Sequence, residues 1–94
     1  MGGIEAINNF YETIAEDNRI GYSHISIYIT LLYFIQDKPL NIPLHIYRER
    51  IMKTARMSRR TYNKCMRELV DYGYIKYEPS SNPAQGSKVY LKKL

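Results

Sequence analysis

The sequence predicts a mainly α-helical fold that carries one small β-hairpin, an α+β class. Three observations predict it: four segments have the apolar spacing or start signals of helices, two short runs near the C-terminus have the composition of strands, and a turn-rich segment separates those runs. Ninety-four residues suffice for one modest hydrophobic core but not for two. We therefore expect a single domain over residues 1–94.

The first helix is expected within residues 1–20. Its apolar residues recur at three- and four-residue steps and predict a buried stripe of Ile4, Ile7, Tyr11 and Ile14. The intervening positions are mostly polar or acidic, so the helix should be amphipathic. Gly21 marks its end.

The second helix is expected over residues 23–37. Ser23 is a suitable N-cap, and Tyr22 could pack on Ile27 as a hydrophobic staple. Apolar side chains cover more than one stripe, which predicts burial on more than one side. One face should meet the core, and the other should meet the first helix or a second subunit. Pro39 forbids continuation.

A short edge strand is predicted at residues 44–47, because its residues alternate and follow Pro43. Two helices joined by a tight turn follow within residues 48–72. Ser58 is the expected N-cap of the second of them, and Gly73 is its expected C-terminal cap.

That longer helix and the segment after it complete the prediction. The longer helix should bury an apolar stripe with Cys65 at its margin, consisting of Tyr62, Met66, Leu69 and Val70. Residues 74–91 read as a β-hairpin, two strand-like runs around a loop rich in Pro, Ser, Asn and Gly.

This order of elements resembles the winged helix-turn-helix family of DNA-binding domains, with an extra N-terminal helix. The resemblance covers most of the chain. It rests on three segments: Arg48-Glu-Arg-Ile-Met-Lys-Thr-Ala, Met57-Ser-Arg-Arg-Thr-Tyr-Asn-Lys and Leu69-Val-Asp-Tyr-Gly-Tyr-Ile-Lys. The chain is similar to small winged-helix regulators and to replication-initiator-type proteins of bacterial mobile elements and phages. The resemblance implies sequence-specific binding of double-stranded DNA, in transcription regulation or as a replication or transfer accessory protein.

Positive charge is concentrated in the second half of the chain. Residues 48–94 contain twelve Lys or Arg and four Asp or Glu, whereas residues 1–47 contain two and five, so +8 and −3 sum to the net charge of +5. A clustered basic region and a pI near 9.4 are typical of a nucleic-acid binder.

The longer helix after the turn is the expected recognition element, because a B-DNA major groove admits one α-helix. Arg59 and Arg60 are the leading candidates, since the arginine fork matches the acceptors of guanine, and Asn63 could pair with adenine. Taken singly, such side chains most often only solubilise a helix, but as a set in this topology they favour DNA. The predicted set on this helix is Ser58, Arg59, Arg60, Thr61, Asn63, Lys64 and Arg67.

The hairpin and the preceding short helix supply a second predicted set. The family resemblance places the hairpin loop along the DNA backbone or in a minor groove, and this loop contains no acidic residue. The predicted flanking contacts are Arg48, Lys53, Ser81, Asn82, Gln85 and Lys88. A merely solvated hairpin is an equally weighted alternative.

The sequence gives no indication of catalysis, a cofactor or a small-molecule ligand. Cys65 is the only cysteine and the two histidines lie on separate elements, so no disulfide and no metal site is predicted. The longest apolar run, residues 25–35, is too short to cross a membrane. We expect a cytoplasmic protein, associated with the nucleoid when bound to DNA. The expected partners are double-stranded DNA and a second copy, bound through the N-terminal helices.

Two alternatives remain open. A winged helix can serve as a protein–protein interaction module, and a basic domain can bind single-stranded nucleic acid. The second alternative requires exposed aromatic side chains for base stacking, and the candidates on the hairpin are Tyr74, Tyr77 and Tyr90. The basic second half and the acid-free hairpin loop favour DNA over a protein partner.

Overall fold

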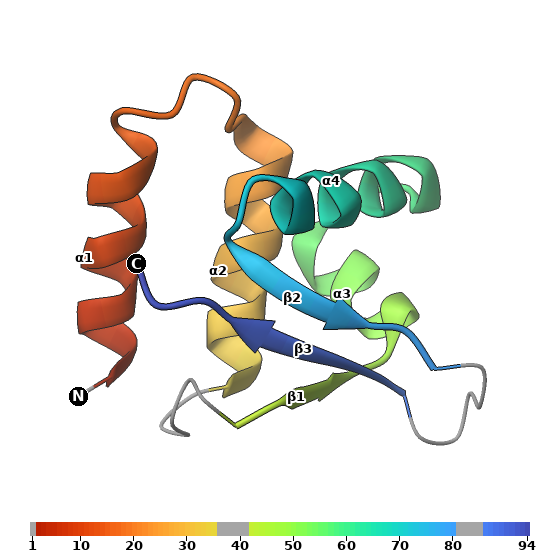
Figure 1. Cartoon of the computed structure of the whole chain (residues 1–94). Coiled ribbons are helices and arrows are strands. Elements are labelled where there is room, and N and C mark those ends of the chain that lie inside the picture. The colour runs from red at the N-terminus through yellow and green to blue at the C-terminus, as the bar shows by residue number, and fades with distance from the viewer. Residues whose placement is uncertain (1, 36–41, 81–85) are drawn as a thin grey trace.

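The computed structural model describes residues 2–35, 42–80 and 86–94 (Figure 1). Its elements in chain order are α1 (Gly2–Ile14), α2 (Tyr22–Ile35), β1 (Leu44–Ile46), α3 (Arg48–Ala55), α4 (Arg59–Asp71), β2 (Ile75–Glu78) and β3 (Ser87–Leu91). The described residues thus form four helices and a three-stranded antiparallel sheet, a mainly helical α+β fold as the sequence predicts. The predicted C-terminal end of the second helix, beyond Ile35, lies outside the described residues.

The sheet has the order β1-β3-β2, so β3 is central and both of its neighbours run antiparallel to it. Val89 of β3 pairs with Leu44 on one side and with Tyr77 on the other. The predicted edge strand is confirmed as β1. Side chains alternate between the two faces of a strand, and Val89 is buried while Lys88 is exposed. The inner face of the sheet therefore meets the helices, and Lys88 lies on the outer face.

Helix α2 packs against α1, α3 and α4 and occupies the middle of the helical layer (Figure 1). Its buried residues cover several sides, as predicted: His24, Ile27, Tyr28, Thr30, Leu31, Leu32 and Ile35. The hydroxyl of Ser26 donates to the carbonyl of Ala55 at 2.9 Å. That hydrogen bond satisfies a carbonyl at the C-terminus of α3 and fixes α3 against α2.

The predicted stripe of α1 is partly wrong. Ala6 and Phe10 form the buried side of the helix, whereas Ile4 is 58% exposed and Tyr11 is 47% exposed. The physical reason is an aromatic stack, because the ring of Phe10 lies parallel to that of Tyr28 with the centroids 4.0 Å apart. This contact turns the helix toward Phe10 rather than toward the predicted stripe.

The predicted start of α2 is also wrong. The helix begins at Tyr22, which is 94% exposed and therefore cannot staple Ile27. The carbonyl of Gly21 accepts the first helical hydrogen bond, from Ile25. Nδ1 of His24 accepts the N–H of Gly21 at 3.0 Å, which satisfies a backbone donor at the helix start.

Both predicted ends of α4 are confirmed. The hydroxyl oxygen of Ser58 accepts the N–H of Thr61 at 3.3 Å. Gly73 has a φ of 86°, and the N–H of Tyr74 donates to the carbonyl of Leu69 at 2.9 Å. This is the hydrogen-bond pattern of a Schellman motif.

The buried stripe of α4 differs from the prediction at two positions. Tyr62, Met66 and Leu69 are buried as expected. Cys65 belongs to the core rather than to its margin, and Val70 is 37% exposed. The buried side of α4 is thus turned away from Val70 and toward the start of α2, where Cys65 Sγ lies within 4.8 Å of the His24 side chain.

We expect Gly73→Ala to destabilise the fold by about 1 kcal/mol, because an L residue is strained in the left-handed region. A Cβ at this position would meet nothing within 4 Å, so the cost is one of backbone conformation alone. Urea unfolding measures it. Gly21→Ala is the matched control, since the nearest atom to its added Cβ is 3.9 Å away. Equal destabilisation by the two substitutions would contradict this account of Gly73.

Candidate nucleic-acid interface

The outward face of α4 presents a row of cations. Successive residues of an α-helix are 100° apart, so Arg60, Lys64 and Arg67 point away from the buried side, and all three are exposed. Among the residues that the structure describes, none of the three has an ion-pair partner. Asp71 lies further along the same face. This row, Arg60, Lys64 and Arg67, is called the cationic face of α4 below.

Arg59 lies at the edge of this face and has a partner. Its Nη2 is 3.3 Å from Oε1 of Glu49, which is also 3.9 Å from Nε of Arg48. These pairs are exposed, and exposed pairs contribute about 0–1 kcal/mol, so an incoming anion can displace them. Sequence reasoning ranked Arg59 with Arg60, but the geometry makes Arg60 the freer of the two.

Ser58 and Thr61 have structural roles at the start of α4. The Ser58 hydroxyl donates to Oγ1 of Thr61 at 3.2 Å and also accepts that residue's backbone N–H. Both side chains are therefore engaged in the cap, and N-caps of this kind stabilise a helix by about 1 kcal/mol.

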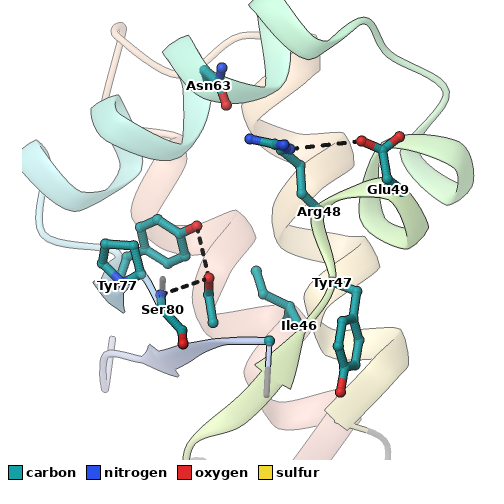
Figure 2. Close-up of a pocket in the computed structure, with 10 residues that line it drawn as sticks. Ile46, Tyr47, Arg48, Glu49, Asn63, Tyr77 and Ser80 are labelled. Atoms are coloured by element: carbon teal, nitrogen blue, oxygen red, sulfur yellow. Dashed lines mark hydrogen bonds and ion pairs between the residues drawn. The ribbon is translucent and has the colours of Figure 1, made fainter. Parts of the chain in front are cut away.

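Asn63 of α4 and Arg48 of α3 both line a cavity of about 440 Å³, which is enclosed by the β1–α3 junction, α4 and the β2–β3 hairpin (Figure 2). On the hairpin side, the Tyr77 hydroxyl donates to Oγ of Ser87 at 3.4 Å, and the backbone N–H of Ser80 donates to the same oxygen at 3.3 Å. We call this cavity the α4–hairpin groove. It joins two predicted site residues that are fifteen positions apart in the sequence.

The remaining predicted residues are not brought to this face. Lys53 is exposed on the side of α3 opposite Ile51, and Lys88 lies on the outer face of the sheet, away from α4. Ser81, Asn82 and Gln85 lie outside the described residues.

The three hairpin tyrosines differ in how far their rings are exposed for base stacking. Tyr74 is buried, and its hydroxyl donates to Asp17 at 2.8 Å. Tyr90 is half-buried, and Nζ of Lys76 lies 5.3 Å from the centroid of its ring. Tyr77 is half-buried beside the groove. A row of exposed stacking rings is thus not formed by these three residues.

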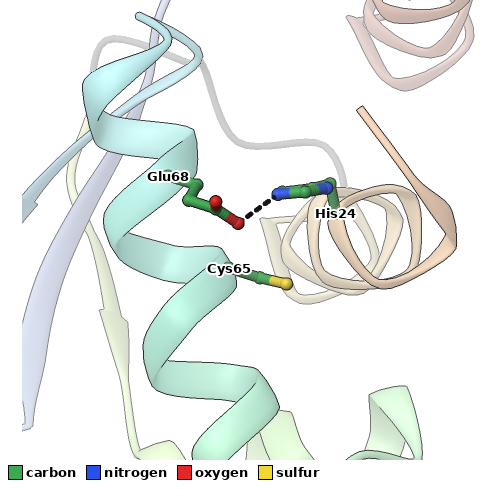
Figure 3. A group of neighbouring side chains, drawn as sticks. All are labelled: His24, Cys65 and Glu68. Atoms are coloured by element: carbon green, nitrogen blue, oxygen red, sulfur yellow. Dashed lines mark hydrogen bonds and ion pairs between the residues drawn. The ribbon is translucent and has the colours of Figure 1, made fainter. Parts of the chain in front are cut away.

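The structure brings together three potential metal ligands that the sequence did not suggest, His24, Cys65 and Glu68 (Figure 3). Their ligand atoms lie within 4.8 Å of one another. Separation along the chain explains why sequence reasoning missed them. His24 stands 44 positions before Glu68.

The hydrogen bonds of His24 decide between a metal site and a structural clamp. Because Nδ1 accepts the N–H of Gly21, the ring proton is assigned to Nε2, which then donates to Oε1 of Glu68 at 3.0 Å. A metal at Nε2 would move that proton to Nδ1, directly against the Gly21 N–H. Burial raises the pKa of Cys65, which favours the neutral thiol. We therefore assign the cluster as a clamp between α2 and α4.

A second set of contacts ties the α1–α2 connection to the end of α4. Asp17 forms an ion pair with Arg19 at 2.8 Å and accepts the Tyr74 hydroxyl. The Arg19 guanidinium lies 4.2 Å from the centre of the Tyr72 ring. Hydrogen bonds from Arg19 and Tyr74 hold the pKa of Asp17 well below its usual range. Burial and the hydrogen bond to Asp17 raise the pKa of Tyr74 to about 12.

Comparison with protein-family models, with curated proteins and with solved structures gave no significant match. No helix within the described ranges has both the length and the apolar character needed to span a membrane. The functional inference therefore depends on the cationic face of α4 and on the groove beside it.

Acid should weaken the fold through Asp17 and Glu68. The hydrogen bond from His24 lowers the pKa of Glu68, so both carboxyl groups have folded-state pKa values below their ordinary values of 3.8 and 4.5. Groups with lowered pKa values stabilise the fold above the unfolded pKa, and that stability is lost as pH falls through the folded one. We expect urea midpoints to fall as pH is lowered below about 4.5.

Asp17→Asn should make that decline shallower, because the carboxyl that is ionised in the folded state has been removed. Glu12→Gln is the matched control, since Glu12 is exposed and has no ion pair among the described residues. The assignment of Asp17 is wrong if both variants follow the wild-type decline.

Proposed function

We propose that this protein is a winged helix-turn-helix domain that binds double-stranded DNA sequence-specifically. In this proposal α4 enters the major groove and the β2–β3 hairpin acts as the wing beside it. The role would be transcription regulation, or an accessory part in replication or transfer of a mobile element. The observation that carries the proposal is the unpaired cationic face of α4 on a helix whose opposite side is fixed in the core.

The dimensions of α4 support insertion into DNA. Its 13 residues span roughly 20 Å at 1.5 Å per residue, and a major groove about 12 Å wide admits one helix. Arg60, in the first turn, can bond both acceptors of a guanine. The backbone N–H groups at the start of the helix favour a nearby phosphate. Lys64 and Arg67 would follow along the groove.

The distribution of charge supports the same orientation. Helix α1 contains Glu5 and Glu12 and contacts α2 on the side away from α3 and α4 (Figure 1). The acidic side chains of α1, Glu5 and Glu12, are therefore held on the far side of α2 from the cationic face of α4. A DNA strand approaching α4 would meet positive charge first, which favours encounter at low salt.

The exposed side of α1 supports homodimerisation through this helix. Ile4, Ile7, Tyr11 and Ile14 follow the three–four spacing of a two-helix seam, and Ile4 and Tyr11 are about half exposed, whereas Ile7 and Ile14 also pack against the core. The flanking position Asn8 is uncharged, so a second copy could approach without repulsion between like charges. We infer a second copy of this chain as the partner, because two-fold dimers match palindromic DNA sites.

Duplex DNA should bind with strong salt dependence, because each neutralised phosphate adds about −0.9 to the slope of log affinity against log salt. We expect a slope steeper than about −3, measured by fluorescence anisotropy on random-sequence duplexes. Selection of bound sequences from random duplexes then supplies the specific site. No binding at low salt, or binding that does not change with salt, would contradict the proposal.

Variants on the two faces of the molecule locate the contact. Arg60→Ala should weaken binding to the selected site by about 1–3 kcal/mol, since Arg60 is expected to read a base. Lys88→Ala is the matched control, because it removes one exposed cation from the outer face of the sheet. If Lys88→Ala weakens binding and Arg60→Ala does not, the placement of α4 in the groove is wrong.

Ile4→Glu and Tyr11→Glu should shift the protein toward monomer in sedimentation equilibrium, because each places a charge in the seam. Affinity for a palindromic site should fall more than affinity for a half-site. Glu12→Gln, on the polar side of α1, is the control. A wild-type protein that is monomeric at all concentrations measured would contradict the dimer.

A further inference from the structure

Glu49 is an acid in a basic part of the surface. It is the only acidic residue of α3, and α4 contains no acid before Glu68. Its Oε1 lies between two arginines, 3.3 Å from Nη2 of Arg59 and 3.9 Å from Nε of Arg48. The Glu49 side chain is 73% exposed and that of Arg59 is 58% exposed. The ion pair between them can therefore open without any change in the core.

This ion pair affects phosphate and base contacts of Arg59 differently. A phosphate that displaces Glu49 from Arg59 only replaces one anion by another. The released carboxylate then lies close to the phosphate, at a separation where repulsion is incompletely screened by 0.1 M salt. A guanine repels the carboxylate less and offers the arginine fork two acceptors. Glu49 therefore penalises backbone contacts of Arg59 more than base contacts.

The neighbouring cations on α4 have no such partner. Arg60, Lys64 and Arg67 form no ion pair among the described residues, so they can neutralise the phosphates of any DNA sequence. Arg59 differs from them because an acid of another helix holds it. A carboxylate in the first turn of α3 also stabilises that helix. That role alone would not change how DNA binding depends on salt.

We propose that Glu49 is a specificity-determining residue, which restrains Arg59 from phosphate contacts and releases it to a base. The inference rests on the proposed function, since it assigns how the same site would separate its target from other DNA. Specificity requires that contacts with the wrong sequence be penalised as well as that contacts with the right one be favoured. The ion pair stays largely closed on random DNA and opens where a guanine meets the start of α4.

Glu49→Gln tests the proposal in the full-length chain by fluorescence anisotropy. Affinity for a random-sequence duplex at low salt should rise about threefold, because a repelling charge is removed. The slope of log affinity against log salt should become more negative by about 0.9, since one more arginine neutralises a phosphate. Affinity for the selected site should change less, so the preference for that site falls.

Glu78→Gln is the matched control for the change in net charge. Glu78 is an exposed acid that pairs with Lys76 at 3.4 Å on the outer face of the sheet, opposite Lys88 in the strand register. Removing it adds the same charge to the protein and also breaks an ion pair. We expect neither the slope nor the preference for the selected site to change. A control that matches Glu49→Gln in both readouts would overturn the proposal.

Arg59→Ala shows whether the effect of Glu49 passes through Arg59. In that background Glu49→Gln should leave the salt slope unchanged, because no arginine is released. Equal steepening in both backgrounds would overturn the proposal. If the wild-type protein binds with the expected salt slope but Glu49→Gln binds both duplexes as the wild type does, the role of Glu49 fails and the proposed function stands. If the wild-type protein binds no duplex at low salt, the proposed function itself fails.

Discussion

Burial of α2 on several sides is the constraint on which the rest of the fold depends. This helix contacts α1, α3 and α4, so each of them is positioned by a shared apolar surface. Its polar side chains reinforce the arrangement, because Ser26 bonds the end of α3 and His24 bonds Glu68 of α4. Fixing the inner side of α4 also fixes which residues point outward. The cationic face is therefore a consequence of core packing as much as of composition.

The polar side chains of α4 fall into two groups, those paired within the fold and those exposed without an ion pair. On the side that faces α2, Glu68 is hydrogen-bonded to His24. On the outward side, Arg60, Lys64 and Arg67 form no ion pair within the described chain. Toward the hairpin, Tyr62 is buried beside Tyr77, and burial raises the pKa of its hydroxyl.

Local signals explain what could be predicted from the sequence. Ser58 and Gly73 were identifiable because helix caps are decided by a few neighbouring residues. The rotation of α1 was not predictable, since it depends on the stack of Phe10 on Tyr28 across two helices. For the candidate site, helical periodicity alone identified the cationic face. The pairing of Arg59 with an acid of α3 and the existence of the groove depend on tertiary placement, which no short pattern encodes.

The central claim is that the cationic face of α4 meets the DNA. The most direct measurement is an amide-resolved NMR titration of the ¹⁵N-labelled protein with a selected duplex at low salt. The account predicts that the largest shifts fall on Arg60, Lys64 and Arg67, and that they diminish as salt is raised. Shifts confined to α1 or to the outer face of the sheet around Lys88, with α4 unchanged, would contradict it.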